Sequence, residues 1–208
     1  MSYPECAMKK RDESTQHPSN MKKAIASLFQ PGPASGSYEA VRDCAHLVHV
    51  KERIEALWSI YAPFADLQFL DDAKHQFHQR TWEMYVGCVL IRHGLVPKKV
   101  SDKGPEFYAE IGGKKVWIEA VAAEPGQGPD AVPSISFHSE ALQPVPEQEI
   151  LLRLTNALDV KWRKYMEDVG KGIIHADDCY VIVLNGWRAS NGRPEPSGIP
   201  YLFKAVLG

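Results

Sequence analysis

Three glutamates stand in surroundings that do not favour a carboxylate. Glu119 lies in the middle of the apolar run 116–121, and Glu106 opens another β-prone run. Glu83 lies in a helical pattern that is apolar on most of its sides. A carboxylate is costly to bury unless a cation, a metal ion or a proton compensates it. Because carboxylate oxygens are the ligands of Mg²⁺ and similar hard cations, these residue types predict metal-assisted chemistry on a phosphate.

The two runs that carry Glu106 and Glu119 flank Gly112 and Gly113. Paired glycines between β-prone runs indicate a β-hairpin, because both residues can take positive φ. The separation of 119 − 106 = 13 residues fits the two strands of one hairpin. Side chains alternate along a strand, so Glu119 and Val121 share one face.

Periodic apolar residues predict three helices, over residues 37–62, 71–93 and 147–169. We expect Ser37 to cap the first helix and Gly94 to follow the end of the second. The continuous apolar run 179–184 predicts a strand that is buried on both faces. The last apolar segment, 199–207, predicts a terminal strand or a truncated element.

Length and composition indicate one globular domain. A chain of 208 residues can bury a well-covered core, and 44% hydrophobic with 24% charged residues is typical of globular proteins. Residues 1–36 are mostly polar, so we expect a mobile tail there and a single domain over residues 37–208. Helices, hairpin and buried strand in this order predict an α/β fold with a mixed sheet covered on both sides.

Charge and cysteine content limit the partner and the compartment. The formal net charge of −2 provides no general basic field, so a nucleic-acid partner would need a local basic patch. The four cysteines show no CxxC spacing, which favours free thiols in a reducing, cytosolic compartment. No uncharged run is long enough to span a bilayer and no signal-peptide pattern is visible, so we expect no membrane partner.

The order of these motifs resembles the PD-(D/E)XK nuclease superfamily, whose members have the restriction-endonuclease-like fold. In that family a strand that opens with Pro-Asp pairs with a strand that bears (Asp/Glu)-x-Lys, and an earlier helix often supplies another Glu. Pro105-Glu106, Glu119-Ala120-Val121 and Glu83 stand at these positions here. The resemblance covers about residues 74–186.

The resemblance implies a metal-dependent phosphodiesterase that acts on DNA, which would be a Mg²⁺- or Mn²⁺-dependent endonuclease. Glu106 and Glu119 would hold the ion, and Glu83 would assist through a water or a second metal. Glu106 replaces the commoner Asp and keeps the ligand type. Val121 replaces the family's Lys, which orients the nucleophilic water or stabilises developing charge. Lys115 or a base of the third helix could take that role.

Three bases of the third predicted helix fall within one narrow sector of its surface. Arg153, Lys161 and Lys164 recur there, together with Ala157, at steps close to whole turns. In the family the helix after the hairpin can present bases to the phosphate backbone. Such contacts would give affinity for DNA without sequence information. The oligomeric state stays open, and a homodimer is among the options.

Two other functions remain open. Val121 favours a catalytically inactive nuclease-fold domain that binds nucleic acid or a protein partner. An unrelated α/β interaction domain is the third option, and it would not retain DNA.

Each motif also has an ordinary structural interpretation. Glu119 would be a solvent-facing strand acid, and Glu106 a residue that follows a turn. Glu83 would be the partner of a nearby arginine, and the basic sector would be a solvated helix face.

Overall fold

The computed structural model describes residues 25–97, 104–135, 144–190, 192–193 and 198–207. In these ranges the helices are α1 (Gly36–Asp43), α2 (Val48–Tyr61), α3 (Phe69–His75), α4 (Phe77–Arg92), α5 (Glu147–Gly170), α6 (Trp187–Ser190) and α7 (Tyr201–Leu207). The short 3-10 helices η1 (Ala45–Leu47) and η2 (Ala62–Phe64) flank α2. The strands are β1 (Phe107–Ile111), β2 (Lys114–Ala122) and β3 (Cys179–Asn185).

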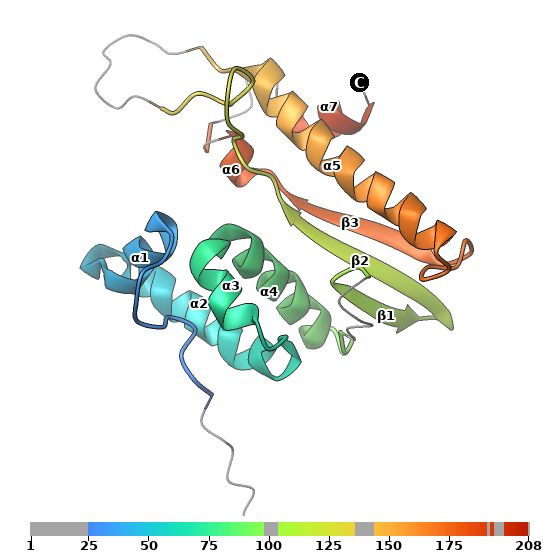
Figure 1. Ribbon diagram of the computed structural model, residues 1–208, viewed down its shortest axis with the longest axis horizontal. Coiled ribbons are helices and arrows are strands. Elements are labelled where there is room, and N and C mark those ends of the chain that lie inside the picture. Colours follow the sequence, from blue (N-terminus) through green and yellow to red (C-terminus); the bar gives the residue numbers. More distant parts are fainter. Residues whose placement is uncertain (1–24, 98–103, 136–143, 191, 194–197, 208) are drawn as a thin grey trace, which may run out of the picture.

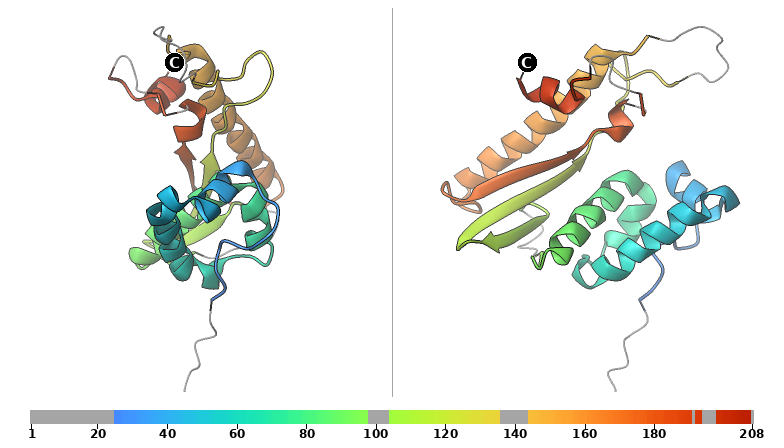
Figure 2. Two further views of the ribbon diagram at one scale, coloured as in Figure 1. Left: turned by 90° about the vertical axis from the view of Figure 1, so that its left-hand side faces the viewer. Right: turned by 180° about the vertical axis from the view of Figure 1, so that it is seen from behind.

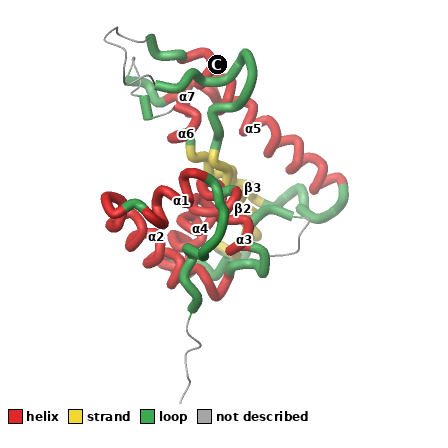
Figure 3. Tube along the Cα trace, turned by 60° about the vertical axis from the view of Figure 1, so that its left-hand side comes forward, coloured by secondary structure: helices red, strands yellow, loops and turns green. Residues whose placement is uncertain are grey.

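The three strands form one small mixed sheet with helices on both faces. Helix α4 packs on one face of the sheet, α2 and α3 pack against α4, and α5 lies along the other face (Figure 1). The view from behind and the trace coloured by secondary structure show the strands between these two helical layers (Figures 2 and 3). The predicted α/β class with a mixed sheet is thus confirmed. No described helix is both long and apolar enough to cross a membrane.

The predicted hairpin is formed by β1 and β2. The strands pair antiparallel, with Phe107 opposite Ile118 and Ile111 opposite Lys114. Gly112 and Gly113 have φ values of 58° and 78°, the left-handed conformations that a two-residue hairpin turn of this type needs. Local sequence is enough to set this register, because the turn length determines which residues face each other.

Strand β3 pairs parallel to β2, and α5 makes the crossover between them. In the described part of the chain β3 is an edge strand, in the order β1-β2-β3, and its residues are half-buried or exposed. The predicted burial on both faces is therefore wrong. Trp82 of α4 donates from Nε1 to the carbonyl of Val183 at 2.8 Å, which ties this strand to the helical layer.

Alternating side chains of β2 point into two different layers. Ile118 and Ala120 belong to the larger core, which α2 and α4 share with Phe107 of β1. Glu119, between them in sequence, faces α5 on the opposite side. A smaller core lies under α5.

The first two predicted helices are each broken once. At Cys44 the backbone is extended, with φ −80° and ψ 119°, and separates α1 from η1 and α2. At Gln76 it leaves the helical region, with φ −117° and ψ 45°, and separates α3 from α4. The apolar periodicity continues across both breaks, so it predicts single helices. Phe69 of α3 stacks on Trp58 of α2, with ring centroids 5.3 Å apart, while α4 contacts the sheet.

Both ends of the described chain differ from the predictions. Residues 1–24 of the predicted tail lie outside the described ranges. Leu28 and Phe29 within that tail are buried, with 1% and 7% of their surface exposed, so the packed part begins well before residue 37. The segment 199–207 contains α7 rather than a strand, and Tyr201 at the start of this helix packs in the core under α5.

Candidate active site

Glu106 and Glu119 face each other across the hairpin. Phe107 pairs with Ile118, and one further step of this register sets Glu106 opposite Glu119. The Glu106 side chain, just before β1, interacts with the carboxylate of Glu119. Side chains of directly opposed residues lie on the same face of an antiparallel pair. Glu119 is fully buried and the Glu106 side chain is 17% exposed. The structure therefore brings together the two acids that the sequence motif predicts as metal ligands.

Side chains hold β2 in place where β1 ends. Glu106 Oε2 accepts a hydrogen bond from Ala120 N at 3.0 Å, in the position that a further β1 residue would occupy. Gln79 of α4 donates from Nε2 to Ala120 O and accepts at Oε1 from Ala122 N, both at 2.9 Å. These bonds satisfy backbone groups that would otherwise lack partners. Sequence reasoning missed Gln79, and nothing in its helical context distinguishes it.

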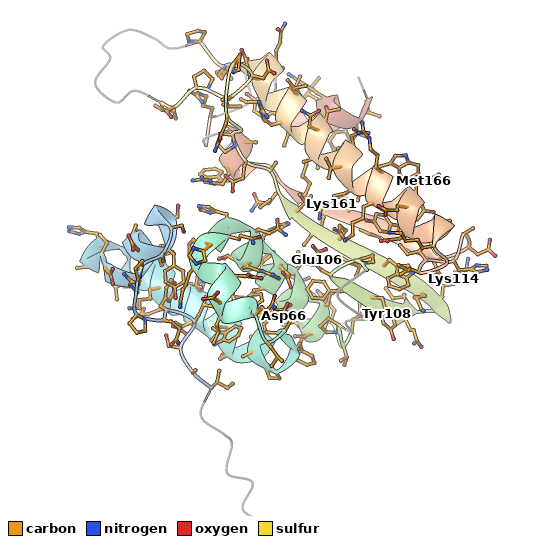
Figure 4. All side chains as sticks on the ribbon, viewed as in Figure 1. Asp66, Glu106, Tyr108, Lys114, Lys161 and Met166 are labelled. Carbon is orange, nitrogen blue, oxygen red and sulfur yellow. The ribbon has the colours of Figure 1, made fainter. Side chains whose placement is uncertain are left out.

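Two lysines of α5 compensate the buried charge of Glu119. Lys161 donates from Nζ to Glu119 Oε1, and its Nζ lies 3.8 Å from Glu106 Oε1. Lys164 Nζ lies 3.2 Å from Glu119 Oε1 and 3.4 Å from Oε2, and it also donates to Gly104 O at 3.2 Å. Figure 4 labels Lys161 and Glu106 in the space between α5 and the start of β1. The cost of burying Glu119 is therefore offset by two ammonium groups.

The other acid of the pair is less well compensated. Burial, and next the nearby carboxylate of Glu119, raise the pKa of Glu106 to about 7, while Lys161 acts in the opposite direction. A divalent cation would remove this conflict. Mg²⁺ usually takes one or two protein carboxylates, together with water and phosphate oxygens, and the donor set of this pair fits that pattern. Within the described ranges no cluster of three or more acids, histidines and cysteines is placed to bind a metal ion.

We expect the metal-free protein to lose stability as pH rises from about 4.5 to about 7. Glu106 stays protonated in the folded state over this window, while the unfolded chain releases the proton near 4.5, so unfolding is favoured as pH rises. One such group contributes a slope of at most about 1.4 kcal/mol per pH unit. Urea unfolding at several pH values measures the slope.

The control for this pH dependence is Glu106→Gln. Glutamine keeps an oxygen that can accept from Ala120 N but cannot titrate, so the variant should lack this part of the slope. If wild type and variant lose stability equally between pH 4.5 and 7, Glu106 is not the group that titrates.

Glu83 lies in a different buried network, between α2, α3 and α4. It is 1% exposed, and its Oε1 accepts from Tyr61 Oη at 2.9 Å. Its Oε2 accepts from Arg80 Nη1 at 2.7 Å, and Arg80 also bonds Asp72. These contacts join Glu83 to the helical layer. Its assistance in catalysis stays a prediction.

The predicted phosphate-binding sector of α5 faces inward. Arg153 donates to the carbonyl of Asp130 from Nε at 3.1 Å and from Nη2 at 2.5 Å, and it packs against Gly126. Lys161 and Lys164, which share this face, bond Glu119. The periodicity correctly groups the three bases, but their contacts in this structure are with the protein itself.

Lys115 is not near the acid pair. Its Nζ lies 5.0 Å from the ring centroids of both Tyr108 and Trp117, toward the hairpin turn. Of the two replacements considered for the family's lysine, the structure therefore places only the third-helix bases beside Glu119.

A third buried acid near this site escaped the sequence analysis. Asp168 of α5 is 3% exposed, and burial raises its pKa. The pKa of Tyr180 on β3 is raised by burial and then by the negative charges of Glu119, Glu106 and Asp168. All three acids therefore interact with the same tyrosine. In sequence Asp168 looks like a solvated residue near a helix end, and its burial depends on the packing of α5.

Comparisons of the chain with protein-family models, with curated proteins and with solved structures give no match. Function is therefore inferred from the residues of the site and their contacts.

Proposed function

We propose that this chain is a metal-dependent phosphodiesterase that cleaves DNA, a divergent nuclease of the PD-(D/E)XK type with a restriction-endonuclease-like fold. The observation that carries the proposal is the facing pair Glu106 and Glu119 with the ammonium of Lys161 beside both. The chain order supports it: α4 precedes the β1–β2 hairpin and α5 follows it, in the order that the motif resemblance implies.

Glu106 and Glu119 are the residues that would hold Mg²⁺ or Mn²⁺. A bound ion would supply a more acidic water and stabilise negative charge on the phosphate. The protein contributes a fixed geometry, because Gln79 and the Ala120 backbone hold the end of the hairpin rigidly around the pair. A buried, preorganised site of this kind strengthens electrostatic interactions with a substrate phosphate.

Lys161 takes the role of the family's motif lysine in this proposal. A lysine at position 121 would emerge from β2 on the face of Glu119, which is the face that α5 covers. Lys161 reaches the same space from α5, so its ammonium can orient a water or stabilise charge on an oxygen held between the two carboxylates. Val121 is then compatible with activity.

Replacing Lys161 by methionine is expected to lower the cleavage rate by about 100-fold, because one preorganised charge at the developing anion is lost. The measurement is the initial rate of nicking of supercoiled plasmid with Mg²⁺ or Mn²⁺. Lys115→Met is the matched control, since it removes the same charge from the hairpin away from the pair. Equal losses in both variants would contradict a specific role for Lys161.

The test of the proposed function as a whole is divalent-dependent cleavage of plasmid DNA by the purified chain. Cleavage should appear with Mg²⁺ or Mn²⁺ and disappear with a chelator. Absence of both cleavage and metal binding under conditions where the protein is folded would overturn the proposal.

The second candidate is an inactive domain of the same fold that binds nucleic acid or a protein partner. A domain that binds no metal must compensate the buried charge of Glu119 in another way. Lys161 and Lys164 already provide this compensation. Calorimetry separates the candidates, because this domain need not bind Mn²⁺. DNA retention without cleavage and without metal binding would favour it.

A further inference from the structure

One carboxylate next to the acid pair has a buried oxygen without a partner. Oδ2 of Asp168 makes no hydrogen bond within the described structure, although the residue is only 3% exposed. Leaving such an atom unsatisfied carries the desolvation penalty of a buried acceptor. Buried unsatisfied atoms in folded proteins call for a specific explanation, and a partner that arrives in another state of the site is one.

Lys164 is placed to be that partner. It precedes Asp168 by 168 − 164 = 4 residues on α5, and residues with this spacing are neighbours on one helix face. The Lys164 side chain is 35% exposed, so its long, flexible stem has room to move. Burial raises the pKa of Asp168, and the charge of Lys164 lowers it.

The contacts of Glu119 distinguish Lys164 from Lys161. Lys161 bonds Oε1 alone, whereas Lys164 contacts both Oε1 and Oε2. An ion that coordinates Glu119 through Oε2 therefore competes with Lys164 and not with Lys161. Two ammonium groups and a divalent ion around one carboxylate would also repel one another strongly in a buried site.

We propose that Asp168 is a positioning residue that accepts the Lys164 ammonium when a divalent ion binds at Glu106 and Glu119. This rests on the proposed function, because it requires an ion at the pair. The exchange moves one positive charge away from the ion and gives Oδ2 of Asp168 its missing partner. Lys161 keeps its place beside both acids. Asp168 thus strengthens metal binding without touching the metal.

The test is a double-mutant cycle on Mn²⁺ affinity, measured by calorimetry on the full chain at one pH above 7. Asp168→Asn should weaken Mn²⁺ binding about 10-fold, the usual scale for a residue that supports a ligand. Lys164→Met should tighten binding, because Glu119 loses a competing donor. In the Lys164→Met background Asp168→Asn should have no effect, since Asp168 acts only through Lys164.

Neighbouring residues provide the controls. Arg163→Met removes the positive charge next to Lys164 in sequence, from a side chain that is 77% exposed and paired with Asp159. Glu167→Gln removes the exposed acid next to Asp168 in sequence. Neither should change Mn²⁺ affinity by more than about 2-fold.

The outcomes separate this inference from the function on which it rests. If wild type binds Mn²⁺ and Asp168→Asn binds equally well, or if its effect persists without Lys164, the exchange is overturned while the metal site stands. If no variant binds Mn²⁺, the metal site and the exchange both fail. Should Asp168→Asn not fold, Lys164→Met alone decides, because unchanged or weaker binding in that variant contradicts the competition.

Discussion

Replacing Glu119 by glutamine is expected to lower the rate of plasmid cleavage by about 1000-fold, the upper range for loss of a preorganised charge in an active site. Glu119 is fully buried, and both lysines of the site, Lys161 and Lys164, contact it. Glutamine keeps the shape of the side chain and removes only the charge. The measurement is nicking of supercoiled plasmid with Mg²⁺ or Mn²⁺, together with calorimetric titration of Mn²⁺.

The matched control for this experiment lies in the same hairpin. Glu110 is an exposed residue of β1, so Glu110→Gln removes an equal charge outside the buried site and should leave the rate within about 2-fold. Circular dichroism confirms that both variants fold. Cleavage by Glu119→Gln at the wild-type rate would remove the acid pair from any catalytic role.

Replacing Glu83 by alanine is expected to destabilise the protein by about 3–5 kcal/mol, the usual cost of breaking a buried ion pair. The substitution removes the most deeply buried carboxylate partner of Arg80, which keeps Asp72, and it removes the acceptor of the Tyr61 hydroxyl. Urea unfolding of wild type and variant measures the loss. Plasmid cleavage by both proteins is measured in parallel, below the unfolding transition.

Glu52→Ala controls for the loss of a helix acid. Glu52 is exposed and paired with His49 on the surface of α2, so its removal should cost less than about 0.5 kcal/mol. If Glu83→Ala instead keeps its stability and loses cleavage, then Glu83 belongs to the active site, as the family resemblance implies. The two measurements therefore decide between a structural and a catalytic role.

The acid pair was predictable because its placement depends on local rules. A two-glycine turn sets the register of a hairpin, and the register sets which residues face each other. Gly112 and Gly113 follow these rules, so Glu106 and Glu119 meet as the spacing predicts. Helical periodicity likewise groups Lys161 and Lys164 on one face, since side chains three or four residues apart are neighbours on any helix.

The direction in which such a face points depends on packing between distant elements. A basic sector on an amphipathic helix is usually solvated, and the sequence contains nothing that says otherwise for α5. Lys161 and Lys164 turn inward because α5 returns the chain to a strand parallel to β2, across the face that carries Glu119. That contact joins residues more than 40 positions apart, as 161 − 119 = 42 shows.

Burial of polar groups has the same long-range origin. Asp168 has an ordinary helical context in sequence, and it is buried because the packing of α5 covers it. The helix breaks at Cys44 and Gln76 arise similarly, since apolar periodicity reports which side of a helix is covered but not where the chain must bend to cover it. Turn chemistry and periodicity thus specify the strands, the register and the grouping of side chains, while contacts between layers decide which charges meet, because burial is a property of the assembled core.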